Sequence, residues 1–336
     1  MRIPTFTDVL RARRLLTDHL SPTPMWSYPV LDAALGATVY VKHENVQPTG
    51  AFKVRGGLTL LSSMPEQERR RGIVGYSTGN HAQSIAYAAR LFGAPCTIVM
   101  PERPNAEKVR AVRALGAEVV LEGAAIDESA QAAARIASEK GMRLVKADEP
   151  ELIAGVGTCY LEIFEALPDL DAVLVPVGSG TGAGAACLVA ASMAPACRII
   201  AVQSEASPAA HASWRQGKCV KESNRTIADG LATGCGFALP QELIRAKLAD
   251  FMLVSDAAIR CAQWLMLTHA HTLAEGAGAA AVAAVMSRPE LFAGQRIAVV
   301  CTGGNASANE MPEVLRAKER PAMAVDGTSE LRASHA

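Results

Sequence analysis

Runs of apolar, β-prone residues alternate along most of this chain with alanine-rich stretches of helical periodicity. The run at 172–177, Ala-Val-Leu-Val-Pro-Val, is apolar throughout, as expected of a strand buried on both faces. Continuous apolar strands that alternate with helices form parallel sheets covered by helices on each side. The pattern therefore predicts an α/β protein with doubly wound sheets.

The same pattern places the individual elements. The expected strands are 38–41, 73–76, 96–100, 118–121, 143–145, 172–177, 198–203, 251–254 and 296–301. The expected helices include 80–92, 105–115, 128–140, 151–167, 181–193 and 256–269. The short βα units between 72 and 147 form a small sheet of their own in this interpretation, inserted into a larger one.

The length of the chain allows one large domain or two modest ones, because it has 336 residues. We expect a large domain from 1–48 and 148–320, and a small domain from 49–147 with its core at 72–147. The sequence becomes polar after Ser307, so the tail at 321–336 is expected to be disordered.

Composition excludes several classes of partner. The 33 basic and 33 acidic side chains balance, so nothing indicates nucleic acid or an anionic membrane surface as a partner. No apolar run is long enough to span a bilayer, and the N-terminus lacks the hydrophobic region of a signal peptide. The eight cysteines are scattered with no C-x-x-C pair, which favours reduced thiols in a cytoplasmic enzyme.

The segment 48–57, Pro-Thr-Gly-Ala-Phe-Lys-Val-Arg-Gly-Gly, places Lys53 at the expected start of a helix. A charged lysine is unfavourable there, because the helix dipole favours anions at the N-terminus. A neutral amine held in a Schiff base removes that conflict, and only a primary amine can bind a cofactor aldehyde in this reversible way. The alternative interpretation is a solvated surface lysine.

A glycine loop follows the expected strand at 172–177 and opens the next helix. Its residues are Gly178, Ser179, Gly180, Thr181 and Gly182. Glycines let backbone N–H groups approach a phosphate closely, and the helix N-terminus adds positive potential. The loop also fits the dinucleotide fingerprint G-x-G-x-x-A through Ala183, with Glu205 after the next strand. A nicotinamide-dependent oxidoreductase and a turn without a ligand therefore remain as alternatives.

Two further polar turns follow expected strands. Ser-Thr-Gly-Asn-His at 77–81 offers hydroxyl, amide and N–H groups at a helix start, which suits a carboxylate; an ordinary helix cap is the alternative. Cys-Thr-Gly-Gly-Asn at 301–305 ends the last strand, where open α/β sheets bind ligands. A plain turn is the alternative there.

These motifs occur in one order with a fifth, Glu-Gly-Ala-Gly at 275–278. From about Ser21 to Asn305 the chain resembles the threonine/serine dehydratase and serine racemase group of fold-type II pyridoxal phosphate enzymes. The resemblance implies a tryptophan synthase β-like fold, in which a small α/β domain inserted into a large cofactor-binding domain closes over the substrate. It also implies an amino acid as substrate and a homodimer.

The resemblance assigns roles to individual residues. It implies that Lys53 forms the Schiff base, that Phe52 packs beside the cofactor ring, and that Asn80 hydrogen-bonds the ring hydroxyl. Thr302 corresponds to the residue that faces the pyridine nitrogen. The glycine loop at 178–182 corresponds to the segment that holds the phosphate. The turn formed by Ser77, Thr78, Gly79 and His81 corresponds to the loop that binds the substrate carboxylate.

The implied reaction is the loss of water from a β-hydroxy-α-amino acid, which yields a 2-oxo acid and ammonia. The freed Lys53 amine is then the base at the substrate α-carbon. A neutral Thr302 at the ring nitrogen favours elimination over transamination. Thr78 carries a hydroxyl on the face opposite Lys53, so racemisation is an alternative, as is a catalytically silent cofactor-binding protein.

The chain departs from the family pattern at several positions. Ala147 and Val156 replace a usual Phe and Gln, which predicts a larger, more apolar pocket for a bulky substrate such as phenylserine. Glu205 and Ala209 match two ligands of the family's divalent cation, but His211 stands where Asp is usual. Because Mg²⁺ and Ca²⁺ prefer oxygen, we expect a weakened or lost site or a different ion; a solvated Glu205 is the alternative.

Overall fold

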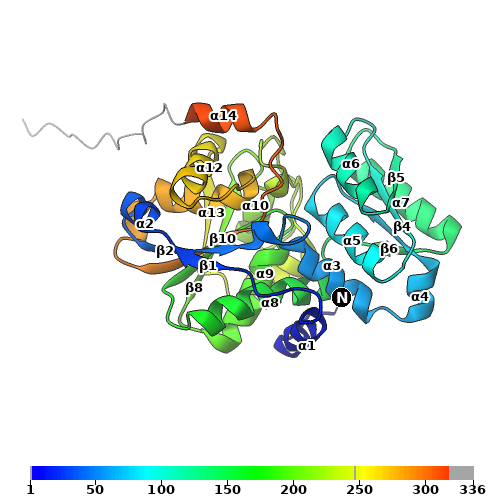
Figure 1. Cartoon of the computed structure of the whole chain (residues 1–336), viewed down its shortest axis with the longest axis horizontal. Helices are drawn as coiled ribbons and strands as arrows, with labels where there is room; N and C mark the ends of the chain where they lie inside the picture. Colours follow the sequence, from blue (N-terminus) through cyan, green and yellow to red (C-terminus); the bar gives the residue numbers. More distant parts are fainter. Residues whose placement is uncertain (1, 246, 318–336) are drawn as a thin grey trace, which may run out of the picture.

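The computed structural model describes residues 2–245 and 247–317, and its two sheets are well separated in Figure 1. The tail at 321–336, which we predict to be disordered, lies outside the described residues. Both sheets are mainly parallel and carry helices on their faces. The predicted α/β class is therefore confirmed.

The larger sheet has six strands in the order β1-β2-β10-β7-β8-β9. All neighbouring strands run parallel except β1, which pairs with β2 in the antiparallel direction. The strands are β1 (Met25–Ser27), β2 (Thr38–His43), β7 (Ala172–Pro176), β8 (Arg198–Ser204), β9 (Asp250–Val254) and β10 (Arg296–Cys301). Only the short edge strand β1 was not expected from the sequence, because its burial is slight and it lacks an apolar run.

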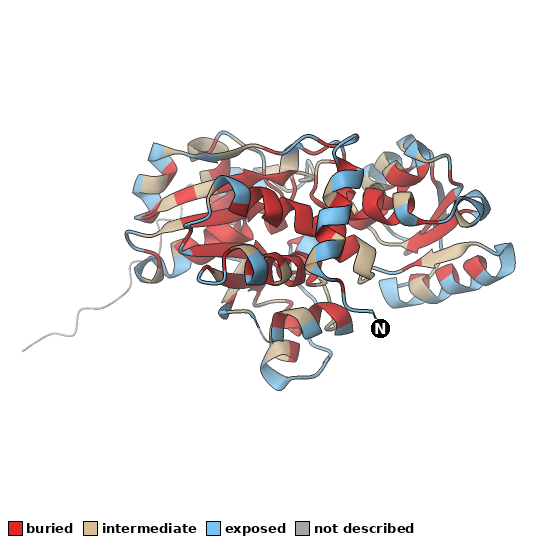
Figure 2. Ribbon diagram, turned by 90° about the horizontal axis from the view of Figure 1, so that it is seen from below, coloured by how far each residue is buried: buried red, intermediate tan, exposed pale blue. Residues whose placement is uncertain are grey.

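Helices cover both faces of this sheet. Leu174 of β7 packs in one core cluster with α12 (Asp256–His269) and α13 (Gly276–Ser287). Its neighbours Val173 and Val175 pack in a second cluster with α8 (Pro150–Ala166) and α9 (Thr181–Met193), because successive side chains of a strand alternate between faces. Figure 2 shows the buried residues gathered on the strands and on the helix sides that face them.

Small residues let these helices approach the sheet closely. Both α9 and α13 consist mainly of alanine and glycine and are buried along most of their length. Close approach of helices explains how a chain with only 4% aromatic residues fills its core without large side chains.

The smaller sheet has four parallel strands in the order β5-β4-β3-β6. They are β3 (Ile73–Tyr76), β4 (Cys96–Met100), β5 (Glu118–Leu121) and β6 (Arg143–Val145). One face packs in a cluster with α5 (Asn80–Leu91) and α6 (Ala106–Ala114), and the other with α7 (Ile126–Lys140). All four strands lie at the predicted residues.

Helix α3 (Lys53–Ser63) lies between the two sheets and packs against both α5 and α8. Glycines make this close packing feasible: a Cβ on Gly57 would lie 2.4 Å from the Ser84 hydroxyl oxygen, and one on Gly155 would lie 2.4 Å from the Arg55 carbonyl oxygen. Because α3 contacts elements of both sheets, the expected domain boundaries at 48/49 and 147/148 stay predictions.

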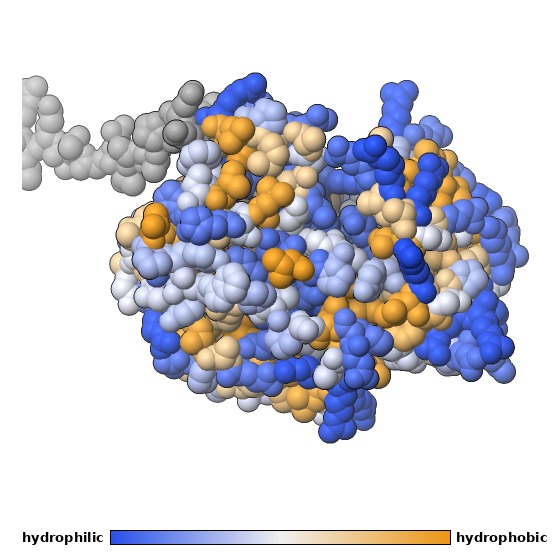
Figure 3. All heavy atoms as spheres, viewed as in Figure 1, coloured by the Kyte–Doolittle hydropathy of each residue, from blue (hydrophilic) through white to orange (hydrophobic). Residues whose placement is uncertain are grey.

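The remaining elements connect and cover the two sheets. They are α1 (Phe6–Leu16), α2 (Pro29–Leu35), α4 (Glu66–Arg71), α10 (Ala209–Gln216), α11 (Ala238–Arg245), α14 (Met311–Arg316) and the 3-10 turns η1 (Glu44–Val46), η2 (Asp229–Leu231) and η3 (Pro289–Leu291). Among the described residues, no helix has the length and hydropathy needed to cross a bilayer. On the face drawn in Figure 3, hydrophobic residues form small groups among polar ones. All eight cysteines carry free thiols.

Candidate active site

The segments singled out by their motifs meet where α3 begins. Ala51 forms a β-bridge with Gly303, and the Phe52 amide donates to the Thr302 carbonyl at 3.0 Å. The Lys53 Nζ donates to the Thr181 hydroxyl at 2.9 Å. The turn after β10, the start of α3 and the glycine loop after β7 are therefore in direct contact.

Lys53 is the first residue of α3, as expected. Its side chain is partly buried, with Nζ 5.1 Å from the centre of the Phe52 ring. Burial lowers the pKa of Lys53 to about 8, and it forms no ion pair with a residue that the structure describes. A substantial fraction of this amine is therefore neutral near pH 8 and able to act as a nucleophile or base.

The glycine loop forms a concave anchor at the start of α9. A Cβ on Gly178 would lie 2.2 Å from the Gly230 carbonyl oxygen, and Gly180 has a φ of +90°, which glycine adopts readily. The hydroxyls of Ser179 and Thr181 lie 2.7 Å apart. Hydroxyls and backbone N–H groups at a helix N-terminus are the donors that a phosphate requires.

A buried hydroxyl lies beside this loop. A Cβ on Gly182 would lie 3.1 Å from the Tyr160 Oη, and this Oη has no hydrogen-bond partner among the described residues. Nothing in the sequence marks Tyr160, because it reaches the loop from α8. An unpartnered buried polar atom next to a phosphate-type loop is consistent with a bound ligand.

Asn80 begins α5 and lies between two large-sheet residues. Its Nδ2 donates to Glu275 Oε1 at 2.6 Å, and its Oδ1 accepts from Asn305 Nδ2 at 2.8 Å. Glu275 is the N-cap of α13, and both partners belong to the quoted motifs, although neither has a predicted role. These contacts bring the start of α5 to the carboxyl end of β10.

The turn before α5 contributes half-buried hydroxyls and a neutral histidine. Ser77 and Thr78 are partly exposed, and the Gly79 amide donates to Ser77 Oγ at 3.1 Å. Burial, together with the nearby Lys53, lowers the pKa of His81 to about 3. The buried His81 Nε2 has no hydrogen-bond partner among the described residues, so His81 offers a neutral ring to this turn.

Thr302 lies at the end of β10 and is 4% exposed. The two residues predicted to flank the substrate side chain lie in different surroundings. Val156 belongs to the buried core cluster that contains Phe52, whereas Ala147 is half-buried in the loop after β6.

The residues predicted to bind a cation lie at the end of β8. Glu205 is exposed and Ala209 is buried at the start of α10, while the His211 ring packs edge-on against Phe251 at 5.4 Å. In the parts of the chain that the structure describes, no group of three or more His, Cys, Asp or Glu side chains is arranged to hold a metal. The expectation about this cation stays a prediction.

A cavity of about 250 Å³ borders Glu275. Besides Glu275, its charged or titratable lining residues are Lys108, Asp229, Arg260 and Glu310. Lys108 of α6 forms an ion pair with Asp229 of η2, and Arg260 pairs with Glu310 at 2.6 Å. The first pair links the layers of the two sheets beside the candidate site.

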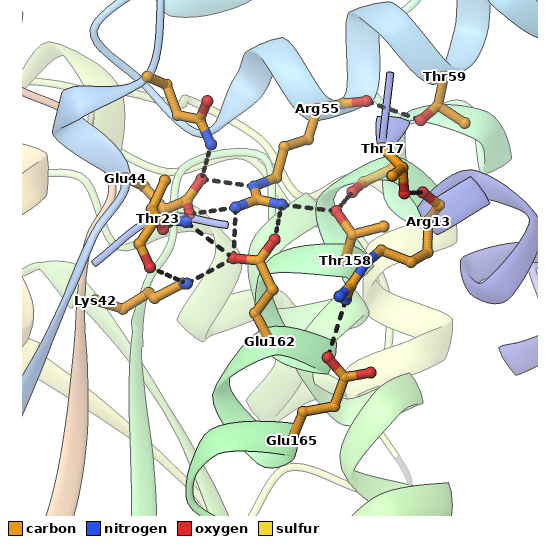
Figure 4. Close-up of polar contacts among 12 residues, drawn as sticks. Arg13, Thr17, Thr23, Lys42, Glu44, Arg55, Thr59, Thr158, Glu162 and Glu165 are labelled. Atoms are coloured by element: carbon orange, nitrogen blue, oxygen red, sulfur yellow. Dashed lines mark hydrogen bonds and ion pairs between the residues drawn. The ribbon is translucent and has the colours of Figure 1, made fainter. Parts of the chain in front are cut away.

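Two residues after Lys53, Arg55 lies in a buried charge cluster of Lys42, Glu44, Arg55 and Glu162 (Figure 4). Its guanidinium donates to both carboxylates over 2.7–2.9 Å, and Lys42 Nζ donates to Glu162 at 2.6 Å. Burial alone would raise the pKa of Glu44, but Arg55 beside it lowers that pKa to about 2. The cluster ties α3 to η1, β2 and α8.

This geometry defines a class of enzyme. A buried lysine beside a phosphate-type loop suits pyridoxal phosphate, and the chain matches the family model described as pyridoxal-phosphate dependent enzyme over residues 16–303. The chain therefore belongs to this family. Of the two cofactors that the glycine loop left open, pyridoxal phosphate is the correct one.

Named relatives narrow the comparison. The chain is 39% identical over 313 residues to L-threonine ammonia-lyase of Thermotoga maritima, covering 93% of this chain and 78% of that protein. It is 33% identical over 321 residues to L-threo-3-hydroxyaspartate ammonia-lyase of Saccharomyces cerevisiae, covering 95% and 98%. The solved structure of processed threonine deaminase isoform 2 from Solanum lycopersicum superposes with a TM-score of 0.88 at 28% identity, covering 94% and 90%. The fold-type II architecture is thereby confirmed.

Proposed function

We propose that this protein is a pyridoxal-phosphate-dependent ammonia-lyase that removes water from a β-hydroxy-α-amino acid and releases a 2-oxo acid and ammonia. The main support is the partly buried Lys53 amine, with a pKa of about 8, in contact with the glycine loop. Relatives named as ammonia-lyases, which align with more than nine tenths of the chain, support the same reaction.

The site residues fit the cofactor. Lys53 supplies the amine for a covalent link, the loop at 178–182 supplies phosphate donors, Asn80 lies toward the ring hydroxyl in this assignment, and Thr302 toward the ring nitrogen. When bound, pyridoxal phosphate supplies a ring that delocalises the electron pair left at the substrate α-carbon after it loses its proton. The protein's part is to hold and orient the reacting groups.

Lys53 takes the proton from the substrate α-carbon in this proposal. An amine with a pKa of about 8 is a stronger base than histidine and is still partly unprotonated near neutral pH. Phe52 would pack beside the cofactor ring in this proposal. Its backbone amide donates to the Thr302 carbonyl at 3.0 Å. This contact holds the start of α3, and hence the Lys53 backbone, against the end of β10.

The turn at 77–81 binds the substrate carboxylate in this proposal. Hydroxyls of Ser77 and Thr78 and the N–H groups at the start of α5 are suitable donors for an anion. His81 stays neutral there because burial lowers its pKa to about 3. Thr78 also carries the hydroxyl on which any racemase side reaction would depend.

We assign a neutral β-substituent to the substrate. Tyr76 ends β3, directly before this turn, and its pKa is raised by burial and then by the carboxylates of Asp148 and Asp127. Neither carboxylate forms a hydrogen bond or ion pair with another residue of the described ranges. Two carboxylates that act on the tyrosine directly before the turn disfavour a substrate with a second carboxylate. Threonine, serine and phenylserine are therefore preferred to 3-hydroxyaspartate, and the small side chain of Ala147 favours a bulky substituent on the substrate.

The proposal is tested by incubating the purified enzyme with these four amino acids and measuring ammonia and 2-oxo acid. We expect a visible cofactor band, borohydride labelling of Lys53, and turnover of the neutral substrates. A colourless protein that releases no ammonia would contradict the proposed reaction, and a D-amino acid as main product would favour a racemase. Turnover of 3-hydroxyaspartate above threonine would contradict the substrate class alone.

We also infer a homodimer in the cytoplasm. Trp26, Val46 and Leu273 are exposed large apolar residues, and the Asn45–Leu273 and Trp26–His43 contacts connect the segments that carry them. Such a surface favours contact with a second copy of the chain. Eight free thiols are typical of a reducing compartment. Light scattering of the wild type and a Trp26→Ser variant measures the mass directly.

A further inference from the structure

A chain of side-chain hydrogen bonds crosses the site from Thr49 to Glu275. Asn305 Nδ2 donates to the Thr49 carbonyl and to Asn80 Oδ1, at 2.8 Å each. Asn80 Nδ2 then donates to Glu275 Oε1 at 2.6 Å. The chain joins Asn80 of the small-sheet layer to residues of the large-sheet layer that lie on either side of it.

The two ends of this chain decide which way the Asn80 amide points. A backbone carbonyl such as that of Thr49 only accepts, so the Asn305 amide must present its NH₂ group to it. Asn80 must then present its oxygen to Asn305 and its NH₂ group to Glu275. Both neighbours favour the same orientation of Asn80, whereas an isolated amide has no such constraint.

Glu275 is itself held in place. Its backbone amide donates to the Gly303 carbonyl at 3.0 Å, and a Cβ on Gly303 would lie 2.3 Å from Glu275 Oε1. Glycine at 303 therefore leaves the space that this carboxyl occupies. Burial raises the pKa of Glu275 to about 7, and the Asn80 hydrogen bond opposes that rise. Whether Glu275 is protonated or ionised, its carboxyl group retains an oxygen that accepts a hydrogen bond from Asn80.

We propose that Glu275 is a positioning residue that acts through Asn80. By accepting one of the two N–H groups on Asn80 Nδ2, it directs the other toward the ring hydroxyl of the cofactor. This inference depends on the proposed function, because Asn80 lies at the ring hydroxyl only when pyridoxal phosphate is bound. It also gives a role to Glu275, which belongs to the motif at 275–278 and had no predicted role.

The test uses the holoenzyme and reads the pH dependence of the cofactor absorbance, together with kcat/KM for L-threonine. Asn80→Ala and Glu275→Ala should shift the absorbance midpoint in the same direction by about one pH unit, since one hydrogen bond to a charged or titrating group is worth roughly that shift. Each should lower kcat/KM about tenfold. The double variant should match Asn80→Ala alone, because the two residues act in series.

Conservative variants separate positioning from packing. Glu275→Gln retains an oxygen that accepts from Asn80, so its midpoint should stay within a few tenths of a pH unit of wild type. Glu275→Asp keeps the carboxyl group but withdraws it by one methylene from Asn80, so it should behave like Glu275→Ala. Glu310→Gln is the matched control, since Glu310 lines the same cavity and forms no hydrogen bond with Asn80.

Several outcomes would overturn the inference. Additive effects of Asn80→Ala and Glu275→Ala, an unshifted midpoint in Glu275→Asp, or an equal shift in Glu310→Gln would each show that Glu275 does not act through Asn80. Thermal unfolding of each holoenzyme identifies variants that lose activity by unfolding, and the Asp and Gln pair then decides. A wild-type protein without a cofactor band contradicts the proposed function instead, so the two failures are distinguishable.

Discussion

Lys53 and Arg55 lie two residues apart on α3, but their surroundings shift the pKa values of these two basic side chains in opposite directions. Arg55 is surrounded by Glu44 and Glu162, which raise its pKa although burial alone would lower it. Lys53 contacts a hydroxyl and an aromatic ring, and burial lowers its pKa to about 8. Burial with counter-charges fixes a charge, while burial without them makes it easy to remove.

The surroundings of the two residues follow the same division. In the buried charge cluster, each charged group has a hydrogen-bonded partner of opposite charge, as a stable buried ion pair requires. Around Lys53, Tyr160 Oη and His81 Nε2 are buried without a partner among the described residues. At the start of α3, one side chain is thus part of an anchor, and the other lies in a site with unsatisfied groups that a ligand can use.

Replacing Lys53 should have the largest effect. We expect Lys53→Ala to lower the rate of ammonia release by more than about 10³-fold, because the variant loses both the covalent link to the cofactor and the base. Ammonia release and borohydride labelling measure this loss. The unfolding midpoint of the cofactor-free protein should change little, since this lysine has no counter-charge among the described residues to leave behind. Retained turnover at more than a tenth of the wild-type rate would contradict the role of Lys53 as covalent link and base.

Replacing Arg55 should act on stability. In Arg55→Met, Glu44 and Glu162 remain buried, and within 2–245 and 247–317 only Lys42 is left as a counter-charge, so we expect a loss of about 3–5 kcal/mol in the free energy of unfolding. Urea unfolding followed by circular dichroism measures it. The matched control is Arg70→Met, because Arg70 forms an exposed pair with Glu66 and exposed pairs contribute little. Equal losses in both variants would show that the buried charge cluster is not an anchor.

Replacing a glycine of the loop at 178–182 should weaken cofactor binding. In Gly178→Ala the new Cβ would lie 2.2 Å from the Gly230 carbonyl oxygen, so the loop must shift and its donors no longer converge. A misplacement of about 1 Å can cost on the order of a hundredfold where geometry is critical. We therefore expect the Kd for pyridoxal phosphate to rise by about a hundredfold. Gly234→Ala is the control, because its Cβ would meet no atom closer than 3.7 Å. Unchanged cofactor affinity in Gly178→Ala would remove this loop from the site.

The sequence predicts the strands well and the contacts between distant residues poorly. All strands except β1 lie where apolar runs predict them, since a strand buried on both faces leaves a strong local signal. The first residue of α3 and the glycine loop are also predictable, because helix starts and βα turns depend on neighbouring residues. The roles of the site residues stay predictions.

The buried charge cluster shows what local patterns omit. Lys42, Glu44 and Glu162 look like ordinary surface charges in the sequence, since such residues are almost always exposed unless they are paired. Their burial depends on contacts with Arg55 and with one another at sequence separations of up to 120 residues. Likewise Glu275 meets Asn80 across 195 residues, a contact that depends on the packing of two sheets and not on local propensity.

His81 gives the smallest expected effect, and it tests directly the buried groups around Lys53 that lack a partner among the described residues. In the folded protein burial lowers its pKa to about 3, whereas an unfolded histidine titrates near 6.5. The unfolded chain therefore binds one more proton between these values, so the stabilising contribution is complete above about pH 6.5 and is lost as the pH falls toward 3.

Between pH 6.5 and 5 the wild type should lose about 2 kcal/mol of its free energy of unfolding from this residue. His81→Gln should abolish that share of the slope, whatever its effect on the absolute stability. Urea unfolding at several pH values measures both slopes, and parallel slopes for wild type and His81→Gln would show that His81 binds its proton in the folded protein as readily as in the unfolded chain.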